Sequence, residues 1–213
     1  MMESPKRRSF IKKSIVGSLA TVIAAKSQAQ MSTPRDAEGP FYPITPQKDK
    51  DADLTQIEGK QGTAKGTIIE VFGQVLDTDM NAIEDVTIDL WQANSFGKYH
   101  HPHDNSEAPI DENFQSWAII QSGVDGKFKF RTVMPGAYPL GVAPENQRTP
   151  HIHFKVGKLG YESLLTQMYF PDQPLNKTDG LYQRKTKAQQ KMMTAQREKG
   201  SNRFLYNIIL EKV

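Results

Sequence analysis

The sequence predicts an all-β fold: a two-sheet β-sandwich of mostly antiparallel strands, with long loops and one short C-terminal helical segment. Short apolar runs alternate with polar positions at a period of two, which is typical of half-buried strands. Turn-forming stretches such as 77–79 and 123–126 separate these runs. A helix is expected only over 183–199, so the chain lacks the strand–helix alternation of α/β folds.

The alternation of apolar and polar positions defines each expected strand. Between 86 and 92, Ile88 and Leu90 alternate with more polar residues, and between 127 and 133 Phe128 alternates with basic residues. The turn Met134–Gly136 ends the second of these runs. Strands are expected over 67–76, 86–92, 117–121, 127–133, 151–156, 163–170 and 204–210.

The composition limits the classes of function. The chain has 213 residues, enough for one domain behind a removable leader, and its hydrophobic fraction of 37% suffices for a β-rich core. It has no cysteine, which excludes disulfides, thiolate metal sites, iron–sulfur clusters and thiol nucleophiles. No apolar stretch is long enough for a stable membrane span.

The first 29 residues predict a secretory signal of the twin-arginine type. Arg7 and Arg8 precede a mildly apolar run at 15–25 and a small-residue cleavage site at 27–29. This leader has six basic residues and one acidic residue, Glu3, so its net charge is +5. Because the whole chain has a net charge of +3, the remainder carries −2. A slightly acidic body argues against nucleic acid as a partner. We expect an exported, periplasmic protein; a basic amphipathic N-terminus without a targeting role is the alternative.

Three regions are expected along the chain. Residues 1–29 form the leader, residues 30–65 an extended N-terminal arm, and residues 66–213 the sandwich domain. The arm is polar and contains four prolines, which disfavour both helix and central strand.

Two histidines, His151 and His153, lie two positions apart in an expected strand. Side chains at this spacing point to the same face, so both imidazoles can reach one metal ion. The nearest downstream acid, Glu162, is too far along the chain for a compact site of two histidines and one carboxylate. A zinc site would need one of the three histidines at 100–103, which lie in a stretch typical of a solvated loop.

Two tyrosines are placed where strands end. Tyr99 follows the turn-like stretch 94–98, and Tyr138 lies in the sequence PGAYP at 135–139. Side chains at strand exits can project into a site at the end of a sandwich. Taken alone, each tyrosine is more often an ordinary packed residue.

Four separated segments carry a family resemblance: WQANSFGKYHH at 91–101, DGKFKFRTVMPGAYP at 125–139, RTPHIHFKV at 148–156 and LLTQMYFPD at 164–172. Together with EGPFYP at 38–43, they resemble the intradiol ring-cleavage dioxygenases. Within that family they are most similar to the iron-bearing β chains of protocatechuate 3,4-dioxygenases. The resemblance covers residues 33–170, with a weaker match near 203–210.

The resemblance implies that Tyr99, Tyr138, His151 and His153 hold one Fe(III) ion. It implies a non-haem dioxygenase that uses O2 to cleave a catechol between its two hydroxyl-bearing carbons, giving a cis,cis-muconate-type diacid. Two phenolates are hard anionic ligands and favour ferric over ferrous iron. By the same resemblance, Tyr138 is the ligand that leaves the metal and takes up a substrate proton.

Two further residues match the family's active site. Arg148 matches its arginine, whose guanidinium can stabilise negative charge that develops on the ring. Gln167 matches a residue beside the iron that orients groups by hydrogen bonding. Leu140 stands where the protocatechuate enzymes have a tryptophan beside the substrate, so protocatechuate, catechol, a substituted catechol and hydroxyquinol all stay open.

Two other functions are compatible with the sequence. A binding or structural sandwich could keep the fold without turnover. A zinc-dependent hydrolase could combine the histidine pair with a loop histidine, although this leaves both tyrosines unexplained. The partners implied by the family are a catecholic small molecule and O2, together with a homo-oligomeric or second chain that completes the pocket.

Overall fold

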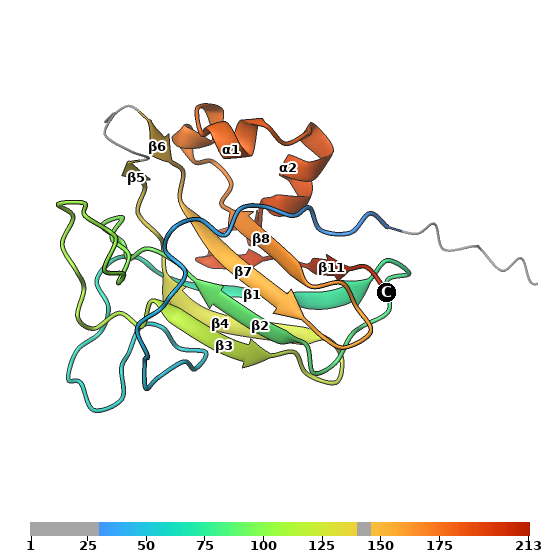
Figure 1. Ribbon diagram of the computed structural model, residues 1–213, viewed down its shortest axis with the longest axis horizontal. Coiled ribbons are helices and arrows are strands. Elements are labelled where there is room, and N and C mark those ends of the chain that lie inside the picture. Colours follow the sequence, from blue (N-terminus) through green and yellow to red (C-terminus); the bar gives the residue numbers. More distant parts are fainter. Residues whose placement is uncertain (1–29, 140–145) are drawn as a thin grey trace, which may run out of the picture.

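Two facing β-sheets form the body of the protein, with short helical turns packed against one end (Figure 1). The computed structural model describes residues 30–139 and 146–213, so the expected leader and Leu140 lie outside the described residues. No helix in the described ranges is long and apolar enough to cross a membrane.

The first sheet has β1 (Ile68–Asp77) at its centre. β1 pairs antiparallel with one strand and parallel with two successive short strands, and a further short strand extends the sheet. These partners are β4 (Lys127–Val133), β10 (Arg203–Leu205), β11 (Ile208–Leu210) and β9 (Gln196–Arg197).

The second sheet is antiparallel throughout, in the order β3-β2-β7-β8. A separate two-stranded ladder, β5 with β6, stands beside its upper end in Figure 1. The bounds are β2 (Thr87–Trp91), β3 (Trp117–Gln121), β5 (Tyr138–Pro139), β6 (Gln147–Arg148), β7 (His151–Gly157) and β8 (Leu164–Tyr169).

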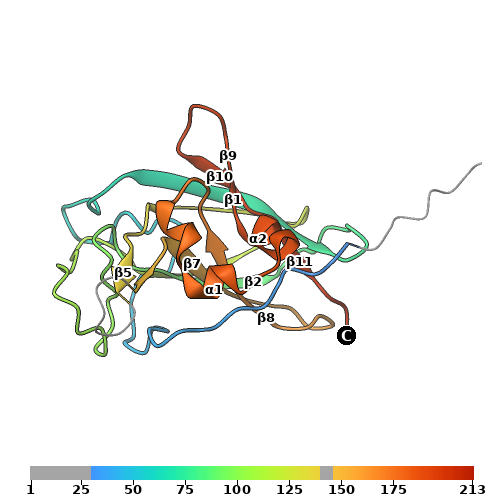
Figure 2. The same cartoon turned by 90° about the horizontal axis from the view of Figure 1, so that it is seen from above.

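The core lies between the inner faces of the two sheets. In β1 the buried positions alternate, with Ile69 and Val71 facing inward. From the other sheet, Ile152 and Phe154 of β7 join the same cluster. Figure 2 shows β1 on one side of the body and β2 and β8 on the other. The expected all-β sandwich of mostly antiparallel strands is therefore confirmed.

The N-terminal arm covers part of the outer face of the second sheet, where it runs as the blue trace of Figure 1. The arm first contacts the other sheet, where the amide of Thr33 donates to the carbonyl of Ile209 in β11 at 2.9 Å, and it reaches the second sheet where the amide of Asp36 donates to the carbonyl of Leu165 in β8 at 2.8 Å. Further along, the Tyr42 hydroxyl donates to the Asp89 carboxylate at 2.7 Å. An outer sheet face that would otherwise meet water is thereby closed over.

The helical segment is shorter than the sequence predicts. A single helix over 183–199 is wrong: α1 (Gly180–Gln183) and α2 (Lys187–Met193) are separate, and 196–197 is the strand β9. Thr186 forms a capping box at the start of α2, so a new helix begins there. Periodicity alone does not distinguish this new start from a continuation of the preceding helical turn. A 3-10 turn, η1 (Pro174–Lys177), precedes α1.

The expected strand over 204–210 is also wrong as a single element, because Tyr206 and Asn207 interrupt it. The side chain of Asn207 accepts a hydrogen bond from the Gln74 amide at 3.0 Å, and the Tyr206 amide donates to the Phe72 carbonyl at 2.8 Å. These contacts hold the interruption against β1 without a regular ladder. The strands over 117–121 and 127–133 have the predicted bounds.

We expect Gly73→Ala to destabilise the protein by about 3 kcal/mol. A Cβ atom at Gly73 would lie 1.8 Å from the carbonyl oxygen of Tyr206, so the interruption between β10 and β11 would have to move away from β1. Urea unfolding measures the effect. Gly200→Ala is not a suitable control because its φ is +71°, whereas Gly180→Ala introduces a Cβ with no atom within 4 Å. Equal stability of the Gly73 and Gly180 variants would contradict the expected clash.

Candidate active site

Four side chains from separate parts of the chain bring their polar atoms together. The Tyr138 hydroxyl lies 3.3 Å from Nε2 of His151, which lies 3.1 Å from Nε2 of His153. Nε2 of His153 in turn lies 3.2 Å from the Tyr99 hydroxyl. All four side chains are buried. The structure thus brings together the four residues expected as metal ligands.

The alternation of β7 places the histidine pair. Ile152 and Phe154 face the core between the sheets, so His151 and His153 face the opposite side, beneath the arm. The expected location at the end of the sandwich is therefore refined to an outer sheet face near one end. His153 packs against the ring of Trp91, stacked at 4.8 Å between centroids with 9° between planes.

The hydrogen bonds of His151 define its proton position. Nδ1 lies 2.6 Å from the carbonyl oxygen of Thr149, which can only accept, so Nδ1 carries the hydrogen. Nε2 therefore presents a lone pair to the cluster. Burial, followed by the nearby positive charge of Arg148, lowers the pKa of His151 well below its ordinary value. Burial, then His151 and Arg148, lowers the pKa of His153 in the same way.

The two tyrosines meet because their loops touch through glycine. A Cβ at Gly97, where φ is +83°, would lie 2.1 Å from the Ala137 carbonyl oxygen, and one at Gly136 would lie 2.3 Å from the Gly97 amide nitrogen. This approach places the rings of Tyr99 and Tyr138 edge to face at 5.2 Å. Glycine at both contact points is what allows the loops to close.

Burial raises the pKa of both phenols in the metal-free protein. For Tyr99 the neighbouring Tyr138 adds to the effect of burial. For Tyr138 the charge of Arg148 works against burial, and the net pKa is still raised. Without a cation the site therefore holds two neutral phenols and two neutral imidazoles.

The spacing of the four donor atoms of Tyr99, Tyr138, His151 and His153 fits a single metal ion shared by all four. Neighbouring ligands with bonds of about 2.0–2.2 Å to one ion lie about 3 Å apart, close to the separations found here. Among residues 30–139 and 146–213, no group of three or more histidine, aspartate and glutamate side chains could hold a metal. The partners of the histidine pair in this cluster are the two tyrosines rather than a third histidine or an acid.

His101, one of the three loop histidines, packs elsewhere. Nδ1 of His101 accepts a hydrogen bond from the His103 amide at 3.1 Å, and the His101 ring packs against Phe41 at 5.7 Å. His101 is buried and belongs to the packing of the arm rather than to the cluster.

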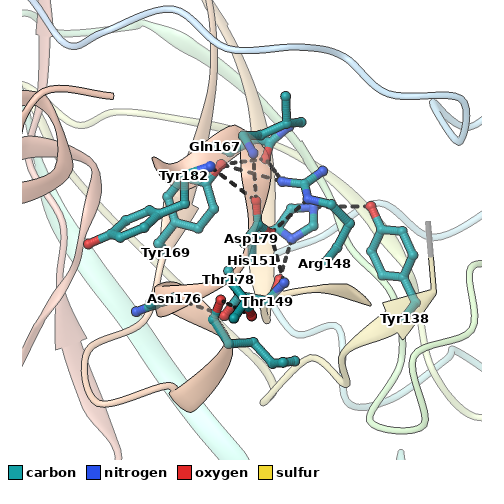
Figure 3. A network of polar contacts seen from close by, with 12 residues as sticks. Tyr138, Arg148, Thr149, His151, Gln167, Tyr169, Asn176, Thr178, Asp179 and Tyr182 are labelled. Carbon is teal, nitrogen blue, oxygen red and sulfur yellow. Dashed lines mark hydrogen bonds and ion pairs between the residues drawn. The ribbon is translucent and has the colours of Figure 1, made fainter. Parts of the chain in front are cut away.

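Arg148 and Gln167 lie next to the cluster, as expected from the sequence (Figure 3). The two-stranded ladder sets Arg148 opposite Tyr138, and the β7–β8 register sets Gln167 opposite His153. The guanidinium of Arg148 donates to Oε1 of Gln167 at 2.6 Å and from Nε to Asp179 at 2.8 Å. Arg148 is 4% exposed, so its ion pair with Asp179 is buried rather than at the surface.

Several neighbours of the cluster were missed by sequence reasoning. Tyr169 lies opposite His151 in the β7–β8 register, and its hydroxyl lies 3.0 Å from Oε1 of Gln167 and 3.1 Å from Oδ2 of Asp36, either of which can accept its single hydrogen. Its spacing of two from Gln167 on a strand was an available signal. Asp179, buried beneath Arg148, could be recognised from sequence only as a residue that begins a helix.

A cavity of about 340 Å³ opens beside Tyr138. Its described lining combines aromatic and polar groups from the arm and the histidine loop. These residues are Phe41, His103, Asp104, Asn105, Ser106, Tyr138 and Pro139.

Comparisons with known proteins give the family of the chain. A family model described as Dioxygenase (Dioxygenase_C) matches residues 37–212. The protocatechuate 3,4-dioxygenase β chain of Burkholderia cepacia is 38% identical over 150 residues, which make up 70% of this chain and 64% of that one. A chlorocatechol 1,2-dioxygenase of Cupriavidus pinatubonensis is 34% identical over 166 residues, 71% of this chain and 60% of the relative. The chain thus spans less than two thirds of the length of these curated relatives.

Among solved structures, the dioxygenase domain of a carbohydrate-binding fusion protein from Streptomyces sp. SirexAA-E superposes with a TM-score of 0.62 at 26% identity, covering 86% of this chain and 100% of that domain. The matched family model covers most of the chain, and the segments at 91–101, 125–139, 148–156 and 164–172 lie within it. The chain therefore belongs to the Dioxygenase family, of the intradiol ring-cleaving type.

Proposed function

We propose that this chain is a non-haem Fe(III)-dependent intradiol dioxygenase that uses O2 to cleave a catechol between its two hydroxyl-bearing carbons. The observation that carries this proposal is the convergence of the donor atoms of Tyr99, Tyr138, His151 and His153 at separations of 3.1–3.3 Å. Two phenols and two neutral imidazoles are a donor set suited to a hard trivalent ion. These four side chains would hold the iron, which when bound would draw electron density from a catechol and make its ring reactive toward O2.

Arg148 would orient the substrate ring and stabilise its negative charge. Burial lowers the pKa of Arg148, but the neighbouring Tyr138 and Asp179 raise it by more, so the net pKa lies above its ordinary value. The guanidinium therefore stays charged. Hydrogen bonds to Gln167 and Asp179 fix its plane before substrate arrives. A positive group that is already in place stabilises developing anionic charge without reorganisation.

Tyr138 is the phenol best placed to accept a substrate proton. It lines the cavity of about 340 Å³ and is 7% exposed, whereas Tyr99 does not line that cavity and is 2% exposed. Because burial raises the pKa of the Tyr138 phenol, its anion binds a proton readily once released. Tyr99 would remain a purely supporting ligand.

The cavity supports a substrate of single-ring size. Pockets for small molecules start at about 300 Å³, and this one meets the cluster at Tyr138. Protocatechuate, catechol, a substituted catechol and hydroxyquinol all belong to the proposal, in line with the names of the relatives. Periplasmic location rests on the leader sequence alone, and a homo-oligomer or partner chain rests on the family resemblance.

The first test is a visible spectrum of the ferric-loaded protein, before and after each candidate catechol is added without oxygen. We expect a broad phenolate-to-iron band that moves to longer wavelength with the true substrate. Admission of O2 should then yield a muconate-type diacid, identified by mass. A protein that stays colourless after ferric loading would leave a zinc-binding or non-catalytic sandwich as the explanation.

A further inference from the structure

One buried carboxylate outside the ligand set accepts four hydrogen bonds. Oδ1 of Asp179 accepts from the amides of Leu181 at 2.9 Å and Tyr182 at 3.0 Å. Oδ2 accepts from Nε of Arg148 and from the amide of Thr149, both at 2.8 Å. Asp179 is 1% exposed, so water does not compete for these bonds.

The two oxygens serve different parts of the molecule. Oδ1 caps the N-terminus of α1, which needs only one acceptor oxygen. Oδ2 instead accepts hydrogen bonds from Arg148 at the end of β6, 31 positions away in the chain, and from Thr149, 30 positions away. An N-cap alone would not require a charged group at the second oxygen, so Asp179 does more than begin a helix.

Asp179 and Gln167 together fix the guanidinium of Arg148. Asp179 binds Nε, and Gln167 accepts from one terminal nitrogen at 2.6 Å. Because the guanidinium is planar, two fixed nitrogens determine both its position and the direction of its remaining N–H groups. A buried arginine without this carboxylate would also lack its compensating charge.

The same carboxylate reaches His151 through one peptide residue. The amide of Thr149 donates to Asp179, and the carbonyl of Thr149 accepts from Nδ1 of His151 at 2.6 Å. The Thr149 hydroxyl donates to the side chain of Asn176 at 2.7 Å, which adds a second tie to the same helical segment. Figure 3 shows these residues grouped beside and below Arg148.

We propose that Asp179 is a positioning residue that aims Arg148 at the substrate and, through Thr149, holds the ring of His151. The segment 174–183, which comprises η1 and α1, would then help to position the active-site residues. The catalytic part of this inference rests on the proposed function. The structural part concerns only Arg148, Thr149 and His151 and can be tested without metal.

The main variant is Asp179→Asn, which keeps the shape but replaces one acceptor by a donor. Either orientation of the amide sets N–H against N–H, at Arg148 and Thr149 or at α1. We expect the turnover number of the iron-loaded enzyme to fall about 10- to 100-fold, the usual effect of losing a partner that orients a reactive group, with a smaller change in KM. Asp179→Glu keeps the charge that compensates Arg148 and displaces the carboxylate, so it tests the same point in a protein that folds.

A readout that does not depend on activity is the NMR spectrum of the metal-free protein. In the wild type we expect slowly exchanging signals from Nε–H of Arg148 and Nδ1–H of His151, because both atoms are buried and hydrogen-bonded. In the Asp179 variants the Arg148 signal should exchange faster and the His151 signal should shift. Unchanged signals in folded Asp179→Glu would overturn the proposal, whatever the enzyme's substrate proves to be.

The matched control is Thr186→Ala, which removes the capping box of α2. It destabilises a neighbouring helix to a similar extent without touching Arg148 or Thr149. We expect a lower melting temperature with unchanged kcat and unchanged Arg148 and His151 signals. If this control lowers kcat as much as Asp179→Asn does, loss of a helix cap explains both effects and Asp179 has no positioning role.

Discussion

Replacement of Tyr99 by phenylalanine is expected to lower turnover at least about 100-fold, since loss of a residue that merely supports a metal ligand already costs 10- to 100-fold. The variant keeps the ring that packs against Phe41 and Tyr138 at 4.8 and 5.2 Å. It removes only the hydroxyl that lies 3.2 Å from Nε2 of His153. The visible band of the ferric-loaded protein should weaken and shift, because one of two phenolates is gone.

Tyr161→Phe is the matched control for this experiment. Tyr161 follows the far end of β7 and pairs with Lys212, so the same chemical change is made away from the cluster. Turnover and spectrum should remain those of the wild type. A Tyr99→Phe variant that retains both its colour and its turnover would remove Tyr99 from the ligand set.

The metal-free protein is expected to lose stability steeply as the pH falls from 6.5 to 5. The pKa values of His151 and His153 are held well below their ordinary value by burial, so both rings stay neutral in the folded protein. In the unfolded chain they become protonated below about pH 6.5, so the unfolded state binds more protons and is favoured. The two rings together contribute a slope of up to about 2.7 kcal/mol per pH unit.

Urea unfolding at a series of pH values, with a chelator present, measures this slope. His101 adds to it, because burial and then His103 lower its pKa as well. His151→Gln should reduce the slope by about 1.4 kcal/mol per pH unit, the full effect of one proton. His100→Gln, in the exposed part of the histidine loop, controls for a change of composition. A stability that is flat between pH 5 and 6.5 would show that the pair titrates normally.

Local patterns in the sequence predict the strands and the direction of the histidine pair. In β7 the apolar positions Ile152 and Phe154 determine the core face, and the opposite face of His151 and His153 follows from a period of two. The interruption between β10 and β11, by contrast, is not determined by the neighbouring sequence. Asn207 ends a strand by accepting a hydrogen bond from Gln74, a residue 133 positions away.

The assembly of the site was predicted by family resemblance rather than by periodicity. Tyr99 and Tyr138 meet because Gly97 and Gly136 let two loops touch, and such a contact has no signature in either loop alone. Asp179 was missed for the same reason, since it lies 31 positions from Arg148 and in sequence only resembles a helix start. Burial by the arm likewise depends on tertiary contacts.

The position of β1 has a consequence for biosynthesis. β1 is the central strand of its sheet, yet both of its parallel neighbours come from residues 203–210, and Glu70 pairs with Arg203 across 133 positions. While the chain is being made, one edge of β1 remains unpaired until residues 203–210 leave the ribosome. Closing so long a loop is slow, so the sheet is completed only after residues 203–210 have been made, and until then the nascent chain exposes an edge that is open to aggregation.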